Sequence, residues 1–252
     1  MSSRAGTRKG RDKPAPAAQP GSSTDGGGAR GKLRLRRGEA GPKRSKSTPA
    51  AILELVLIIA VALGLALAIQ AWVVKPYRIP SGSMEPTLAV GQRVLVNRIG
   101  MQFSDPHVGE IAVFHPPRDA EQQVCGPTPH VVKPGGAACA EPEPAHSGVN
   151  FIKRIVGGPG DEIYIREGHV FRKPKGKSSF EAEKDSYIKP CPTDTQECNF
   201  PTPIKIPPGH WFMMGDNRGE SDDSRFWGPV PKGWIIGGAF ATYWPLDRIG
   251  IL

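Results

Sequence analysis

The chain has 252 residues and a formal net charge of +9, and its length allows one sizeable domain or two small ones. Residues 1–49 hold 13 of the 33 basic residues and 3 of the 24 acidic ones, so residues 50–252 carry a net charge of only −1. The basic character therefore belongs to an N-terminal tail, and the composition excludes a strongly basic folded domain.

The N-terminal tail, residues 1–49, is rich in Gly, Pro, Ala and Ser and has hardly any large apolar residue. Such a segment cannot bury enough apolar surface to offset the loss of chain entropy, so we expect it to be disordered. Nucleic-acid binding by its basic residues is a weaker alternative, because no aromatic residues are interleaved with them for base stacking. We expect no nucleic-acid partner.

The next segment, Leu55–Val74, is a run of 20 residues without a charge. Its length matches the about 20 residues that cross a bilayer core about 30 Å thick. We therefore predict a transmembrane anchor helix within residues 50–75, and the basic tail should hold the N-terminus in the cytoplasm. A cleaved signal peptide is the alternative, but its apolar core is usually shorter, at about 7–15 residues.

Residues 76–252 contain several short segments with the composition of β-strands and, beyond the anchor, no strong helix signal. The pattern predicts strands with flanking turns at 91–98, 108–114, 151–156, 207–217 and 235–245, and a hairpin formed by 162–166 and 168–171. These segments indicate a mainly β domain outside the membrane. Residues 116–149 and 173–203 lack this periodicity, and we predict that they are long loop insertions.

All four cysteines lie in these two insertions. An even number of cysteines in an oxidising compartment favours two disulfides, although the sequence allows three pairings. We expect the local pairs Cys125–Cys139 and Cys191–Cys198. A Cys/His metal site that uses His130 or His146 is the alternative, but the spacing is not that of a Cys-x-x-Cys site.

In the segment Ile79–Leu88, one proline precedes Ser81 and Ser83 and another follows them. Each proline fixes its own φ and disfavours the helical region for the residue before it, while the glycine between the serines is free. We expect a stiff turn that presents Ser83 in one geometry; an ordinary surface loop is the alternative. At about 3.3 Å per extended residue, Ser83 lies within about 30 Å of the end of the predicted span at Val74.

Lys153 lies within an apolar segment, between Phe151-Ile152 and Ile155-Val156. A lysine that points into a core loses hydration, which lowers its pKa from the usual value of about 10.4. A neutral amine next to Ser83 could take the proton of the hydroxyl, which is a poor nucleophile on its own. The alternative is a surface-facing lysine on an edge strand. The six histidines, the more usual bases, lie next to no recognisable motif.

Residues 215–228 are dense in turn-forming and charged residues. Acidic and basic groups this close can pair and hold a loop rigid. A solvated surface loop is one alternative. A calcium-binding loop is another, but the residue order of an EF-hand loop is absent.

With these residues in view, the chain resembles the type I signal peptidases, which are membrane-anchored Ser/Lys endopeptidases. The resemblance consists of four ordered blocks after an N-terminal anchor: Pro80–Leu88 (PSGSMEPTL), Gly109–Phe114 (GEIAVF), Lys153–Asp161 (KRIVGGPGD) and Gly215–Trp227 (GDNRGESDDSRFW). Glu110 stands where the family more often has Asp, and the insertion at 116–149 is longer than in many members. Neither departure touches a position implied to be catalytic.

The resemblance implies a role for each matching residue. Ser83 matches the nucleophile, and Lys153 matches the general base. Ser81 matches the hydroxyl that forms the oxyanion hole with the Ser83 backbone N–H, and Ser221 matches the hydroxyl that orients the lysine amine. The residues expected to support the site structurally are Arg154, Asp216, Arg218, Asp223 and Arg225. The family's catalytic domain is largely antiparallel β and uses no metal or cofactor, so we expect the same for residues 76–252.

The implied function is that of a membrane-bound serine endopeptidase that removes N-terminal signal peptides from secreted pre-proteins during or after translocation. Its partners would be these signal peptides, the lipid bilayer and the translocation machinery, with the catalytic domain on the outer face of the cell membrane. The family prefers small residues at −1 and −3 of the cleavage site, which implies shallow apolar pockets near Ser83.

Two other kinds of protein remain as alternatives. A Ser/Lys self-cleaving repressor shares this chemistry, but it should be soluble and carry a DNA-binding helical domain. A membrane-tethered β domain without enzymatic activity is the second alternative, and a serine-directed acylating probe would distinguish it.

Overall fold

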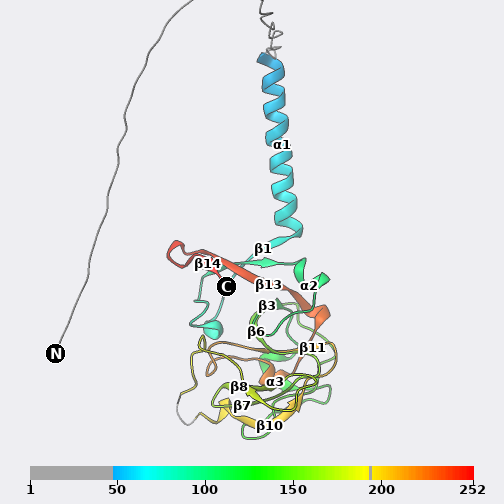
Figure 1. Cartoon of the computed structure of the whole chain (residues 1–252), viewed down its shortest axis with the longest axis vertical. Coiled ribbons are helices and arrows are strands. Elements are labelled where there is room, and N and C mark those ends of the chain that lie inside the picture. Colours follow the sequence, from blue (N-terminus) through cyan, green and yellow to red (C-terminus); the bar gives the residue numbers. More distant parts are fainter. Residues whose placement is uncertain (1–47, 193–194) are drawn as a thin grey trace, which may run out of the picture. The chain divides into compact units, whose positions relative to one another are not determined.

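The computed structural model describes residues 48–192 and 195–252. The predicted disordered tail, residues 1–49, therefore lies almost wholly outside the described residues. The described chain begins with one long helix, α1, and continues into a domain of short strands and loops (Figure 1).

Helix α1 spans Thr48–Trp72 and is predominantly apolar on all sides, and its residues from Thr48 to Gln70 are exposed. Its segment Thr48–Gln70 is long and apolar enough to cross a bilayer. The helix ends before the predicted end of the span, because Val74 already begins strand β1, Val74–Arg78. Pro76 cannot continue a helix, and β-branched valines at 73 and 74 favour an extended backbone.

The main sheet is antiparallel throughout, in the strand order β1-β2-β13-β3-β6-β11-β12, with β14 paired to β13. Its strands after β1 are β2 (Arg93–Asn97), β3 (Ile111–Phe114), β6 (Phe151–Gly157), β11 (His210–Met214), β12 (Val230–Pro231), β13 (Ile235–Trp244) and β14 (Gly250–Ile251). Each strand predicted from the sequence in this part of the chain is present, and the mainly antiparallel β class is confirmed. Strand β6 lies between β3 and β11, so it is not an edge strand.

A second sheet has the order β10-β7-β8-β9, with β7 at Glu162–Arg166, β8 at His169–Lys173, β9 at Glu181–Ala182 and β10 at Phe200–Lys205. The predicted hairpin is confirmed, since β7 and β8 pair through a turn at Glu167 and Gly168, both with positive φ. The loop prediction for 173–203 is wrong in part, because β9 and the start of β10 lie there. In β10 two prolines hide the strand pattern, while Phe200 and Ile204 point into the core.

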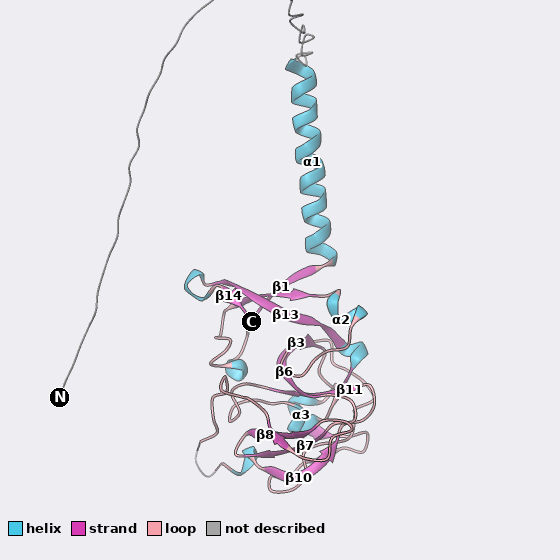
Figure 2. Ribbon diagram, in the orientation of Figure 1, coloured by secondary structure: helices cyan, strands magenta, loops and turns pink. Residues whose placement is uncertain are grey.

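Short elements connect these sheets, and Figure 2 shows how much of the domain is loop. Two α-helices of one turn each follow the anchor, α2 (Gly100–Phe103) and α3 (Ser224–Trp227). The 3-10 turns are η1 (Gly82–Met84), η2 (Ala120–Gln122), η3 (Gln196–Cys198), η4 (Lys232–Trp234) and η5 (Leu246–Arg248), and a small hairpin pairs β4 (Val124–Cys125) with β5 (His130–Val131). The insertion at 116–149 is therefore not entirely loop.

Two apolar clusters cover the two faces of the main sheet. Along β3, Ala112 and Phe114 belong to one cluster, whereas Ile111 and Val113 belong to the other. This alternation is the two-residue period of a strand that is buried on both faces. The cluster that contains Ile111 also includes Met84 and Leu88, so the serine segment is anchored in this core.

The disulfides are Cys125–Cys139 and Cys191–Cys198, as expected from the sequence. Because all four sulfurs are paired, the Cys/His metal site considered above has no thiolate ligand.

Candidate active site

The turn that carries Ser83 is held from both ends. Ile79 and Met84 are buried, the Ile79 N–H donates to the Gln92 carbonyl at 2.8 Å, and the Leu88 N–H donates to the Met84 carbonyl at 2.8 Å. The 3-10 turn η1 places Ser83 between these anchors. The prediction of a stiff turn rather than an ordinary surface loop agrees with this arrangement.

The loop that follows β11 supports the same turn from the other side. The Asn217 N–H donates to the Ser83 carbonyl at 3.1 Å, and the Asn217 side-chain amide donates to the Gly82 carbonyl at 3.1 Å. A Cβ on Gly215 would lie 2.4 Å from the Ser83 carbonyl oxygen and 2.2 Å from Ser221 Oγ. Only glycine fits at 215, because its missing side chain lets these two groups approach the same backbone position.

Lys153 is the third residue of β6, opposite Ala112 of β3, and it is only 4% exposed. Phe151 packs against the core cluster that contains Ile155, so strand alternation points Lys153 to the same side. Its Nζ lies 5.7 Å from the centre of the Phe151 ring. The alternative of a surface lysine on an edge strand is therefore wrong.

The pKa of Lys153 is lowered from 10.5 to about 8 overall. Burial is the largest cause and Arg225 acts in the same direction, while Asp223, Asp222 and Asp216 act to raise the pKa. Desolvation has the largest effect because a buried ammonium loses its hydration. A lysine with this pKa has an appreciable neutral fraction near pH 8, as a general base needs.

Ser81, Ser83 and Lys153 line one pocket of about 440 Å³. The Ser81 hydroxyl donates to Ser83 Oγ at 3.4 Å. Ser221 does not line this pocket, but it is buried beside Gly215, and its hydroxyl has no hydrogen-bond partner among the described residues. The structure thus brings together three of the four residues expected to act in the site and places the fourth directly behind the serine turn.

Arg154 and Asp216 form the first ion pair that supports the site. The Arg154 guanidinium donates to both Asp216 oxygens, at 2.9 and 2.6 Å, and Thr87 Oγ1 donates to Asp216 Oδ2 at 2.6 Å. These contacts tie the strand of Lys153 to the loop after β11 and to the serine segment. Asp216 is fully buried, and a paired charge of this kind has a structural role.

Asp223 and Arg225 form a second buried pair, with Nε to Oδ1 at 2.7 Å and Nη2 to Oδ2 at 3.0 Å. Burial alone would raise the pKa of Asp223, but the charge and hydrogen bonds of Arg225 hold it below its usual value. The Gly215 N–H donates to Asp223 at 3.1 Å, and Arg225 donates to the Ser221 carbonyl at 3.1 Å. The pair therefore fixes the backbone on both sides of Ser221.

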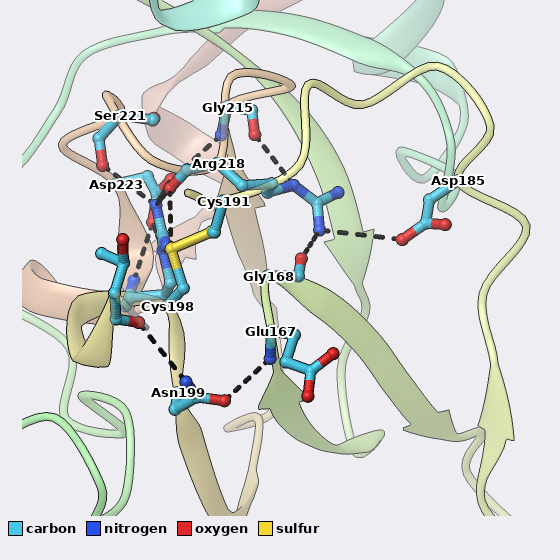
Figure 3. The surroundings of a disulfide bond; sticks show 12 residues. Glu167, Gly168, Asp185, Cys191, Cys198, Asn199, Gly215, Arg218, Ser221 and Asp223 are labelled. Carbon is cyan, nitrogen blue, oxygen red and sulfur yellow. Dashed lines mark hydrogen bonds and ion pairs between the residues drawn. A yellow bond between two sulfur atoms is a disulfide. The ribbon is translucent and has the colours of Figure 1, made fainter. Parts of the chain in front are cut away.

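Arg218 completes this scaffold beside the Cys191–Cys198 disulfide (Figure 3). Its Nε donates to the Gly215 carbonyl at 3.0 Å, and its Nη1 donates to the Gly168 carbonyl in the β7–β8 turn. The Cys198 sulfur lies 3.7 Å from the Arg218 carbonyl. The five residues expected to be structural all make ion pairs or hydrogen bonds of this kind, and none of them lines the pocket of Ser83 and Lys153.

Three residues of the site were not predicted from the sequence. Asn217 lies in the predicted motif but was given no role. Asp222 and Glu121 line the pocket with Ser83 and Lys153, and Glu121 comes from the insertion at 116–149. The charge density of residues 215–228 was the one available signal for Asp222; nothing in the sequence of the insertion marked Glu121.

The sequence model of the family described as "Signal peptidase, peptidase S26" matches residues 52–244. A probable signal peptidase I-2 of Synechocystis sp. is 34% identical over 211 residues, which cover 83% of this chain and 82% of the relative. A signal peptidase I of Leptolyngbya laminosa is 33% identical, with 84% and 93% covered. A signal peptidase I of Pseudomonas fluorescens is 28% identical, with 74% and 71% covered. The chain belongs to the signal peptidase family, peptidase S26.

Proposed function

We propose that this protein is a membrane-anchored serine endopeptidase that removes N-terminal signal peptides from secreted pre-proteins, with Ser83 as nucleophile and Lys153 as general base. Membership of the signal peptidase family supports the reaction. The observation that carries the residue assignment is the buried Lys153, with its pKa lowered to about 8, in the same pocket as Ser83.

In the proposed mechanism, neutral Lys153 takes the proton of Ser83, which attacks the carbonyl carbon at the cleavage site. The Ser83 backbone N–H and the Ser81 hydroxyl donate to the oxyanion, and one such donor is typically worth about 2.7–4 kcal/mol. Lys153 then gives the proton to the leaving amine. The Lys153 amine, neutral again, activates the water that hydrolyses the acyl-enzyme. The unpartnered hydroxyl of Ser221 supports its role in orienting the amine.

The anchor helix fits a membrane-bound enzyme. We propose that the N-terminus is cytoplasmic and that the catalytic domain lies on the outer face of the cell membrane, because the basic charge precedes α1. This arrangement would keep Ser83 near substrates that are themselves in the bilayer. The translocation machinery is a proposed further partner.

Cleavage of a purified pre-protein by the detergent-solubilised full chain tests the proposed function. We expect one cut, at the end of the signal peptide, and covalent labelling of Ser83 by a serine-directed acylating probe. An intact pre-protein together with an unlabelled Ser83 would favour the membrane-tethered domain without enzymatic activity.

A glycine substitution tests whether the loop after β11 fixes the geometry of the site. We expect Gly215→Ala to lower kcat at least about 100-fold and to destabilise the fold by about 1–3 kcal/mol, because its Cβ would overlap Ser221 and the Ser83 carbonyl. Thermal unfolding and steady-state cleavage measure both effects. Gly233→Ala is the matched control, since a Cβ there meets nothing within 4 Å. A fully active Gly215→Ala protein would contradict the tight contact.

A further inference from the structure

Asp222 is a pocket residue to which the proposed mechanism gives no role. It follows Ser221 and precedes Asp223, and it lines the pocket that holds Ser83 and Lys153. Its Oδ1 atom is buried and has no hydrogen-bond partner among the described residues. Asp223, in contrast, is fully paired with Arg225. A buried carboxylate oxygen without a partner is unfavourable, so Asp222 has the capacity to bind a further donor.

The charges around Asp222 are unbalanced. Two other carboxylates line the same pocket: Glu121, on η2, and Glu220. Glu220 already accepts a hydrogen bond from Asn217 at 3.1 Å and lies 3.7 Å from Lys189 Nζ. Among the described residues that line the pocket, Lys153 is the only cation. The pocket therefore carries more negative than positive charge when its carboxylates are ionised.

The electrostatics of Asp222 reflect this imbalance. Burial, followed by the charge of Asp223, raises the pKa of Asp222 to about 7, and Glu121 acts in the same direction. Lys153 and Arg225 lower it, but Arg225 is committed to Asp223 and to backbone carbonyls. Lys153 is thus the main cation that remains to balance Asp222.

The proposed reaction removes this remaining cation. Lys153 must be neutral to accept the proton of Ser83, and Asp222 then loses its counter-charge in a pocket that Glu121 also lines. A cationic side chain on the substrate would restore the balance. Its charge would also disfavour the protonated form of Lys153, because like charges nearby lower the pKa of an amine. Such a substrate would bind more tightly and would also raise the reactive fraction of the enzyme.

We propose that Asp222, assisted by Glu121, is a specificity-determining residue that selects substrates with a lysine or arginine side chain close to the scissile bond. This proposal rests on the proposed function, since it names the substrate class for the same pocket. The substrate's lysine or arginine side chain would compete with Lys153 for Asp222 and would supply the positive charge that Lys153 loses in its neutral, reactive form.

Matched peptide pairs test the proposal with the full chain in detergent. Each pair carries lysine or methionine at one position. That position is moved across about three residues on either side of the scissile bond, while small residues are kept at −1 and −3. At pH 8 we expect kcat/KM to be about fivefold higher for the lysine peptide at one or more positions. We also expect this kcat/KM ratio to grow between pH 6 and 8, as Asp222 of the free enzyme ionises. The acidic limb of the kcat profile, which reports the enzyme–substrate complex, should lie at lower pH for the lysine peptide.

Three variants test whether Asp222 and Glu121 cause the preference for the lysine peptide. Asp222→Asn should bring the lysine/methionine ratio close to 1, and Glu121→Gln should reduce it. Asp119→Asn removes a neighbouring negative charge that does not line the pocket, and it should leave the ratio unchanged. If Asp222→Asn fails to fold, Glu121→Gln decides the question.

A ratio near 1 at every position in the wild type, or a preference that persists in Asp222→Asn and Glu121→Gln, would overturn the proposal and leave the proposed function intact. Failure of the wild type to cut either peptide or a pre-protein would instead contradict the proposed function, and this inference with it.

Discussion

Ser83→Ala should lower kcat at least about 10⁴-fold, because removal of the nucleophile of a serine peptidase leaves only residual catalysis. Its hydroxyl accepts from Ser81 at 3.4 Å, a long contact that contributes little to folding. The thermal unfolding temperature should therefore stay within about 2 °C of the wild type. Cleavage of a pre-protein and calorimetry of the same preparation measure the two effects.

Ser179→Ala, on the exposed part of the insertion at 173–203, serves as the control and should cleave at the wild-type rate. Retention of more than about a tenth of the wild-type kcat by Ser83→Ala would mean that another group attacks the substrate.

Lys153→Met should lower kcat by about 10²–10⁴-fold, the range expected for loss of a general base. Methionine keeps the length of the side chain but cannot accept a proton. The free energy of unfolding should not fall, because the buried amine of the wild type is desolvated at an energetic cost. Loss of activity in a protein of undiminished stability would separate a catalytic role from a structural one.

The matched control is Lys205→Met, which removes an exposed lysine from β10. It should leave kcat unchanged. If a folded Lys153→Met protein and Lys205→Met have the same modest effect on kcat, Lys153 is not the base.

The central part of the fold could be predicted because its strands are short, apolar and bounded by turn residues. Segments such as Phe151–Val156 and Ile235–Trp244 carry that signal themselves. Strand β1 and strand β10 could not be found in this way. Pro76 lies in β1, and two prolines lie in β10, so both strands owe their conformation to pairing with β2 and β7 and not to local preference.

Only part of the candidate site could be predicted from the sequence. The burial of Lys153 follows from its apolar neighbours once β6 is known to be an interior strand, which the sequence alone left open. The contact of Gly215 with the Ser83 carbonyl joins residues 132 positions apart in the chain, so no local sequence pattern could predict this contact. Glu121 enters the pocket from an insertion without periodicity, so only the three-dimensional structure assigns it to the site.

The proposed mechanism depends on a Lys153 amine that becomes neutral near pH 8 in the same pocket as the Ser83 hydroxyl. The most direct measurement is the rate of Ser83 acylation by a serine-directed probe between pH 6 and 10, in the wild type and in Lys153→Met. Since only the neutral amine acts as a base, the wild-type rate should rise with pH, pass its midpoint at about 8 and then level off. The Lys153→Met rate should be low and show no such midpoint. A wild-type midpoint near the ordinary lysine value of 10.5, or identical profiles for the two proteins, would contradict the account.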